Sequence, residues 1–133
     1  LGYGISSDKA LLERMETVRQ PWSVSTPAQA AGLSALKEDH REEQTRQLVK
    51  SERERMEKEL ENLRIEYIPS EANFLLFNSE INWFEELKKR GILIRDCANY
   101  RGLGNGWYRL AVRLPEENDR LLECMKQVLN ERS

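Results

Sequence analysis

The first third of the chain contains two short stretches in which apolar residues recur at helical spacing. Residues 9–18 show this spacing directly after Asp8, a residue type that can cap a helix N-terminus. A turn-rich connector (QPWSVSTP, residues 20–27) follows. Thr26 can cap a second helix that has Pro27 at its first position and continues through residues 28–36. The pattern therefore predicts two short helices separated by a turn.

Residues 37–64 are dominated by charge, since 17 of these 28 residues are Asp, Glu, Lys or Arg. Pairs such as Glu42–Arg46 and Glu54–Lys58 have the i, i+4 spacing that supports an exposed helix. The apolar positions are few: Leu48, Val49, Met56, Leu60 and Leu63. A coiled coil is the alternative, but these positions do not sustain a heptad repeat. A long surface helix with one thin apolar stripe is the favoured interpretation.

From residue 64 onward, strand and helix patterns alternate. The predicted order is strand, strand, helix, strand, strand, helix, at residues 64–68, 73–78, 80–90, 92–97, 107–113 and from Pro115 onward. Gly91 stands at the position where a helix over 80–90 would end. This order predicts an α+β domain in which helices cover a small, mostly antiparallel sheet, preceded by helices that include the long charged one.

Arginines interrupt the last two predicted strands. Arg95 falls within strand 92–97, and Arg109 and Arg113 fall within strand 107–113. Strand side chains alternate between faces, so Arg109 and Arg113 share the face opposite the apolar set. That apolar set is Tyr108, Leu110 and Val112. If the two strands are neighbours, Arg95 and Arg109 project to the same side, and this is how rigid elements build a site for a small anion.

Two interpretations of these arginines follow from the spacing alone. They are surface residues, solvated or paired with Asp96, Glu116 or Glu117, since exposed ion pairs are common and weak. Alternatively, they bind a carboxylate or a phosphate through the planar guanidinium fork. The loop residues between the two strands, Asn99 and Tyr100 among them, can line a pocket mouth, but in a loop they more often form turns.

Composition narrows the classes of function. The chain has 133 residues, 33% of them charged, and a net charge of −2, so it lacks the basic excess of a nucleic-acid or anionic-membrane surface. No apolar run has the length of a membrane span. His40 is the only histidine, which argues against a metal site or a histidine-based triad. Cys97 and Cys124 suit two free thiols in a reduced compartment, so we expect a cytoplasmic protein.

The chain begins with Leu1, Gly2, Tyr3, Gly4 and Ile5, without a methionine. These residues have the pattern of a strand end, whereas natural termini are usually polar and frayed. We therefore expect the chain to be the C-terminal part of a longer protein.

Residues 92–122 (ILIRDCANYRGLGNGWYRLAVRLPEENDRLL) resemble the C-terminal end of the fold-type I, class I/II pyridoxal-phosphate-dependent aminotransferases. The resemblance is closest to histidinol-phosphate aminotransferases and to the threonine-phosphate decarboxylases of cobalamin synthesis. The opening LGYGIS resembles the segment that follows the cofactor lysine in that family, and PWSVSTPAQAAGLSAL resembles the next segment. The similarity runs through nearly the whole chain.

The resemblance implies an architecture and an activity. Residues 1–36 would be a remnant of the large domain with the interdomain connector, and residues 37–133 the C-terminal small, substrate-binding domain. The full-length protein would bind pyridoxal 5′-phosphate, form a homodimer and act on an amino acid, often a phosphorylated one. The lysine that holds the cofactor and its other binding residues would precede Leu1. We therefore expect no cofactor binding and no catalysis by residues 1–133 alone.

The resemblance also implies roles for individual arginines. Arg109 matches the arginine that grips the substrate α-carboxylate, and Arg95 matches the one that helps to hold a distal phosphate. Arg113 matches a further arginine of the pattern, for which a structural ion pair is favoured. Amino transfer and decarboxylation both stay open, as do a stand-alone regulatory domain that binds an amino acid and an adaptor that binds a partner through residues 37–64.

Overall fold

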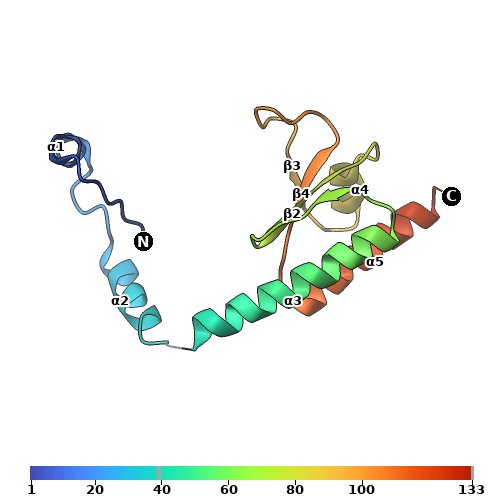
Figure 1. Ribbon diagram of the computed structural model, residues 1–133, viewed down its shortest axis with the longest axis horizontal. Coiled ribbons are helices and arrows are strands. Elements are labelled where there is room, and N and C mark those ends of the chain that lie inside the picture. The colour runs from blue at the N-terminus through green and yellow to red at the C-terminus, as the bar shows by residue number, and fades with distance from the viewer. Residues whose placement is uncertain (39, 133) are drawn as a thin grey trace. The chain divides into compact units, whose positions relative to one another are not determined.

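The computed structural model describes residues 1–38 and 40–132, and the chain divides into two units, Leu1–Glu42 and Glu43–Ser133. The described residues form five helices and four strands, drawn in Figure 1. The helices are α1 (Lys9–Val18), α2 (Thr26–Ala35), α3 (Arg41–Asn62), α4 (Trp83–Lys89) and α5 (Pro115–Asn130). The strands are β1 (Tyr67–Ile68), β2 (Phe74–Asn78), β3 (Arg95–Asp96) and β4 (Trp107–Ala111). The predicted α+β class is confirmed.

The first unit contains α1 and α2 and has no buried residue among those described. The Asp8 carboxylate accepts a hydrogen bond from the Leu11 N–H and caps α1, as predicted. The cap of α2 is Ser25 and not Thr26, because the Ser25 hydroxyl accepts from the Ala28 N–H while Thr26 already belongs to the helix. The shift by one residue moves the proline to the second helical position, where a missing N–H costs no helical bond.

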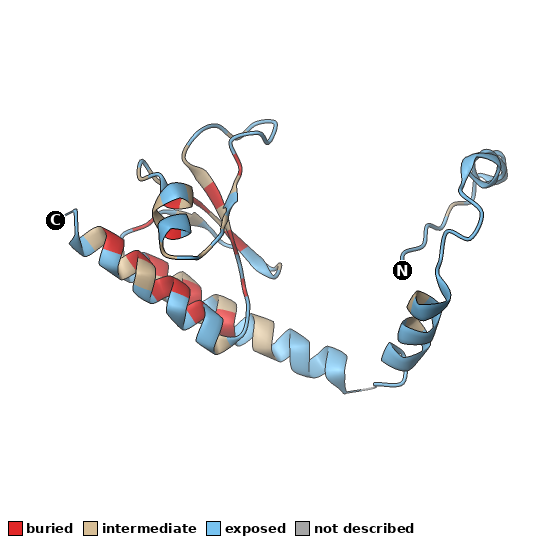
Figure 2. Cartoon of the chain, turned by 180° about the vertical axis from the view of Figure 1, so that it is seen from behind, coloured by how far each residue is buried: buried red, intermediate tan, exposed pale blue. Residues whose placement is uncertain are grey.

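The second unit is built on a four-stranded antiparallel sheet with the strand order β1-β2-β4-β3. One face of the sheet carries Leu75, Phe77, Tyr108 and Leu110 into the core. Helices α3, α4 and α5 supply the rest of that core, with Met56, Leu60, Trp83, Leu87, Met125 and Val128. Figure 2 shows the buried residues where the helices and the sheet meet. The long charged helix thus packs through one narrow stripe, as the sparse apolar positions predicted.

The first strand is shorter than the predicted 64–68. Helix α3 ends in a turn in which the Ile65 N–H donates to the Leu60 carbonyl at 2.9 Å. Arg64 takes the left-handed backbone conformation with φ 56°, an uncommon conformation for a residue with a side chain. The chain therefore completes the helix cap before it enters the sheet, and β1 contains only Tyr67 and Ile68.

The third strand is also shorter than the predicted 92–97. Gly91 closes α4 with φ 74°, and the Ile92 N–H then donates to the Leu87 carbonyl at 2.9 Å. Residues 91 and 92 thus belong to the helix cap, which confirms the role predicted for the glycine. Pairing with β4 is confined to Arg95 and Asp96.

The start of α4 and the end of β4 also differ from the prediction, and in both places an asparagine side chain accepts a hydrogen bond from a backbone N–H. Helix α4 begins at Trp83 instead of residue 80 because Asn82 caps it by accepting from the Glu85 N–H at 3.2 Å. Strand β4 ends at Ala111 instead of residue 113 because the Arg113 N–H donates to the Asn118 amide oxygen at 3.0 Å.

A partly buried polar network joins α3 to α5. The Arg55 guanidinium contacts Glu52 and Asp119, each at 2.7 Å. The side-chain amide of Asn118, which is almost fully buried, donates to Glu52 at 2.7 Å and to the Arg113 carbonyl at 2.9 Å. The hydrogen bonds from Arg55 hold the pKa of Glu52 below its ordinary value despite the opposing effect of burial. The network therefore fixes the two long helices and the end of β4 in one register.

Among the described residues, no helix is both long and apolar enough to cross a bilayer. Cys97 and Cys124 are both free thiols, the first buried and the second half-buried.

Candidate functional site

The sheet brings two arginines directly opposite each other. Arg95 of β3 and Arg109 of β4 are partners in the antiparallel register. Directly opposed residues share a face, with their Cβ atoms about 5 Å apart. This is the face opposite the core set of Tyr108 and Leu110, which confirms the alternation predicted from the sequence.

Arg109 stands on the central strand pair and is half-buried. Its guanidinium carbon lies 5.1 Å from the centre of the Phe74 ring. Phe74 belongs to β2, where Leu76 is the register partner of Arg109, so the ring is the diagonal cross-strand neighbour. The aromatic face supports the guanidinium without neutralising it.

Arg95 stands on the edge strand and is exposed. One terminal nitrogen donates to the Asn99 side-chain oxygen at 3.0 Å, and the guanidinium carbon lies 5.4 Å from the centre of the Tyr100 ring. The sequence offered Asn99 and Tyr100 only as turn formers or residues of a pocket mouth. Their contact with Arg95 depends on the path of the loop, which no spacing rule predicts.

Neither Arg95 nor Arg109 forms an ion pair with a carboxylate anywhere in residues 1–38 and 40–132. Arg113 differs: its guanidinium contacts Glu117 at 2.7 Å, so the ion pair favoured for it is confirmed. Like charges placed opposite each other on neighbouring strands destabilise a sheet. An anion held between the two guanidinium groups would relieve this repulsion.

The nearest thiol does not supply that negative charge. Cys97 follows β3 and is fully buried. Burial raises the pKa of the thiol, and the charges of Arg109 and Arg95 oppose that rise only in part. The thiol therefore stays protonated at neutral pH and does not pair with either guanidinium.

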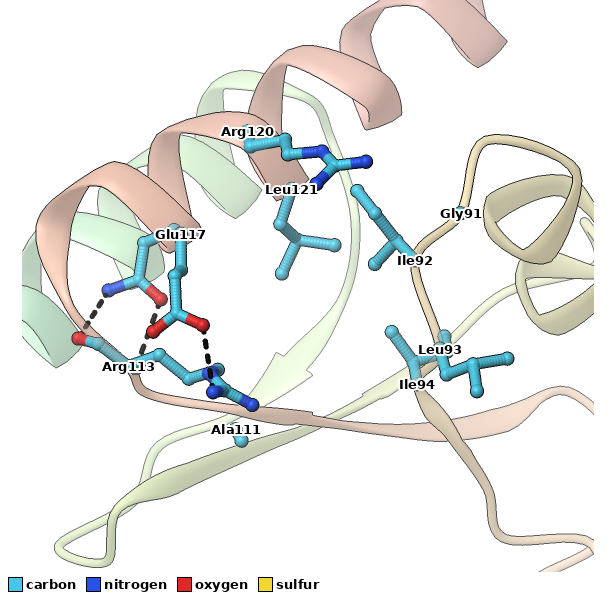
Figure 3. Close-up of a pocket in the computed structure, with 10 residues that line it drawn as sticks. Gly91, Ile92, Leu93, Ile94, Ala111, Arg113, Glu117, Arg120 and Leu121 are labelled. Carbon is cyan, nitrogen blue, oxygen red and sulfur yellow. Dashed lines mark hydrogen bonds and ion pairs between the residues drawn. The ribbon is translucent and has the colours of Figure 1, made fainter.

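A pocket of about 240 Å³ is lined by Arg113 but by neither Arg95 nor Arg109. It lies between residues 91–94, the end of β4 and the first turns of α5 (Figure 3). In this view Arg113 is turned toward Glu117 at the pocket wall. Another lining residue, Ala111, stands two positions from Arg109 on β4 and so shares its face of the sheet.

Metal ligands are absent from the described part of the chain, where no group of three or more His, Cys, Asp or Glu side chains could hold an ion. The candidate site is a pair of guanidinium groups on neighbouring strands with aromatic and amide partners.

Comparison with known proteins assigns the chain to a family. The model of the family described as "Aminotransferase class I and II" matches residues 1–124. The chain belongs to this family. The structural neighbours have the same fold. The histidinol-phosphate aminotransferase of Clostridium acetobutylicum superposes with a TM-score of 0.84 at 28% identity, covering 92% of this chain and 39% of that one.

The names of curated relatives of this aminotransferase-family chain describe two activities, amino transfer and decarboxylation. Histidinol-phosphate aminotransferase 1 of Archaeoglobus fulgidus is 41% identical over 130 residues, which cover 97% of this chain and 40% of that protein. Threonine-phosphate decarboxylase of Salmonella typhimurium is 38% identical over 133 residues, covering 97% of this chain and 36% of that protein. The chain thus spans well under half the length of the relatives it matches.

Proposed function

We propose that this chain is the C-terminal, substrate-binding part of a longer pyridoxal-phosphate-dependent enzyme that acts on a phosphorylated amino acid. The observation that carries the proposal is the direct opposition of Arg95 and Arg109 on one sheet face, without a carboxylate partner for either. The family membership supports it, as do the phosphorylated substrates in the names of the relatives. Residues 37–133 would form the small domain, and residues 1–36 a part of the large domain with the connector.

Each arginine has a separate role in this proposal. Arg109, half-buried and supported by Phe74, offers its two terminal nitrogens to the α-carboxylate of the substrate. Arg95, at the exposed edge, binds the distal phosphate. A guanidinium suits both anions because its planar fork forms two parallel hydrogen bonds. The substrate would lie across the two strands with one anionic end at each arginine.

Pyridoxal phosphate, when bound, supplies the carbanion stabilisation in enzymes of this kind. Three lysines of the second unit have carboxylate partners and are poor candidates for a covalent site. Lys126 pairs with Glu59 at 2.7 Å, which raises the pKa of the lysine, and Lys88 and Lys89 lie on the exposed side of α4 beside glutamates. A lysine that holds the cofactor needs a lowered pKa. We therefore assign cofactor binding to a part of the enzyme outside this chain, and the homodimer to the complete protein.

The test uses the complete enzyme with Arg95→Ala, assayed on L-threonine O-phosphate and on L-threonine. Loss of a charge-assisted bidentate contact should lower kcat/KM on the phosphorylated substrate roughly 30-fold or more, and about 2-fold on threonine. Arg101→Ala is the matched control, because Arg101 is an exposed arginine of the loop that follows β3. Equal losses on both substrates for Arg95→Ala would withdraw the phosphate-binding role.

A decarboxylase is the second candidate, and the likeness to the Salmonella enzyme favours it. The two activities differ in the products formed from L-threonine O-phosphate. Decarboxylation releases carbon dioxide and leaves an amino alcohol phosphate. Amino transfer converts the substrate to an oxo acid and passes its amino group to a second oxo acid, which becomes an amino acid. Measurement of released carbon dioxide distinguishes them.

A further inference from the structure

The loop after β3 holds Arg95 through two neutral groups. The Asn99 amide oxygen accepts one hydrogen bond from the guanidinium at 3.0 Å. The ring of Tyr100 lies under the same guanidinium, 5.4 Å from ring centre to guanidinium carbon. Arg95 is itself exposed, so burial does not hold its side chain in place. These two contacts are what orients it.

The two holding residues are themselves fixed by the loop. The Asp96 carboxylate accepts from the Ala98 N–H at 2.8 Å, and the Tyr100 N–H donates to the Cys97 carbonyl at 2.9 Å. The Tyr100 carbonyl then accepts from the Leu103 N–H at 3.1 Å. The fully buried Cys97 side chain anchors the beginning of the loop in the core. Asn99 and Tyr100 are therefore presented by a closed series of turns.

The neutrality of the two partners matters for binding. A guanidinium has five N–H donors, and the asparagine oxygen occupies one of them, which leaves the others for a ligand. The aromatic face attracts a cation but adds no negative charge. A carboxylate in the place of Asn99 would hold the arginine as well, but it would neutralise the charge and repel an incoming phosphate.

We infer that Asn99 and Tyr100 are positioning residues that hold Arg95 oriented and uncompensated, and that they thereby set the preference for phosphorylated over unphosphorylated substrates. The inference rests on the proposed function, since it needs Arg95 to bind the phosphate. Its measure is the selectivity ratio, defined as kcat/KM on L-threonine O-phosphate divided by kcat/KM on L-threonine.

The first test compares Asn99→Ala with Asn99→Asp in the complete enzyme. Asn99→Ala removes the acceptor, and the selectivity ratio should fall about 5-fold. Asn99→Asp keeps an acceptor of the same shape but adds a negative charge, and the ratio should fall about 30-fold. A residue that only stabilised the loop would give the opposite order, with aspartate milder than alanine. That opposite order overturns the inference.

The second test concerns the ring. Tyr100→Leu removes the aromatic face, and the selectivity ratio should fall about 3-fold. Tyr100→Phe keeps the face and should restore the ratio to within about 2-fold of the parent, because the contact with Arg95 uses the ring. If Tyr100→Leu and Tyr100→Phe change the selectivity ratio equally, Tyr100 has no positioning role through its ring.

The control is Asn105→Asp, which adds the same charge to an exposed asparagine of the same loop. Its selectivity ratio should stay within about 2-fold of the parent, because screening by water weakens a charge away from Arg95. Failure of the inference is separate from failure of the proposed function. If Arg95→Ala lowers the ratio while the Asn99 variants leave it unchanged, only the positioning role is lost. If Arg95→Ala itself leaves the ratio unchanged, the phosphate-binding role is lost first.

Discussion

Two regions of the second unit use arginine in opposite ways. Between α3 and α5, Arg55 contacts two carboxylates, those of Glu52 and Asp119, each at 2.7 Å. On the open face of the sheet, Arg95 and Arg109 face each other and contact only neutral groups. The first arrangement satisfies the charge within the protein. The second leaves it available to a ligand.

The difference predicts different consequences of mutation. Removal of one member of the compensated network leaves a partly buried charge or amide without its partner, so the free energy of unfolding should fall. Removal of a sheet-face arginine relieves a like-charge contact, so folding should survive while binding is lost. Stability and substrate affinity should therefore separate between the two regions.

The largest effect is expected for Arg109→Lys in the complete enzyme. Lysine keeps the charge but lacks the bidentate fork, so kcat/KM on L-threonine O-phosphate should fall about 30- to 1,000-fold, or roughly 2–4 kcal/mol. The free energy of unfolding in urea should change by less than about 0.5 kcal/mol. Histidinol phosphate lacks a carboxylate and is the control substrate, on which the loss should be much smaller. A fall in the free energy of unfolding with unchanged kcat/KM would contradict this prediction, because Arg109 would then stabilise the fold instead of binding substrate.

The next effect is expected for Glu52→Ala. This change removes the buried carboxylate that accepts from Arg55 and from Asn118 at 2.7 Å each. The free energy of unfolding should fall by about 2–3 kcal/mol in urea denaturation. Glu54→Ala, at an exposed position of the same helix, is the control and should stay within about 0.5 kcal/mol of the parent. Equal losses in the two variants would show that the network contributes nothing specific.

A smaller effect is expected on the free energy of unfolding at acidic pH. The hydrogen bonds from Arg55 lower the pKa of Glu52 below its ordinary value of 4.5, so the folded state binds a proton there less readily than the unfolded state. The stabilisation from ionised Glu52 is thus present above pH 4.5 and is lost as the pH falls through the lowered folded-state value. Glu52→Gln should therefore flatten the acid side of the stability curve. Parallel curves for parent and variant below pH 4.5 would contradict this.

The smallest effect is expected for the exposed pair of Arg113 and Glu117, which lies 2.7 Å apart on the surface. A double-mutant cycle with alanine at both positions should give a coupling of about 0.5 kcal/mol in the free energy of unfolding. The selectivity ratio should not change, because Arg113 already has its carboxylate. A coupling above about 2 kcal/mol would place this pair with the compensated network instead.

The sequence predicted most of the fold and the site geometry because those features depend on local rules. Strand alternation placed Arg95 and Arg109 on one face, and the pattern of turns placed Gly91 at the end of a helix. The resemblance then supplied the roles that spacing could not, and these roles stay proposals. Spacing alone also left Arg113 open between an ion pair and a ligand site, and the contact with Glu117 decided it.

The features that the sequence did not predict depend on how particular side chains compete for backbone groups. Strand propensity favoured a strand over 92–97, but the Ile92 N–H donates to the Leu87 carbonyl in the cap of α4 and is not available for strand pairing. The buried amide oxygen of Asn118 likewise accepts a hydrogen bond from the Arg113 N–H, and β4 ends before that residue. The contacts of Asn99 and Tyr100 with Arg95 arise from a loop whose path follows from several hydrogen bonds together.

The strand order has a consequence for biosynthesis. β4 is the partner of both β2 and β3, yet it is the last of the four strands that the structure describes. During synthesis the chain emerges from the ribosome N-terminus first, so β2 and β3 emerge before Trp107–Ala111. Until β4 emerges, the strand edges that pair with it are unpaired and open to aggregation. The arrival of one five-residue strand closes the sheet and delivers Arg109 opposite Arg95 at the same moment. No nascent chain can therefore present the arginine pair before its sheet is complete.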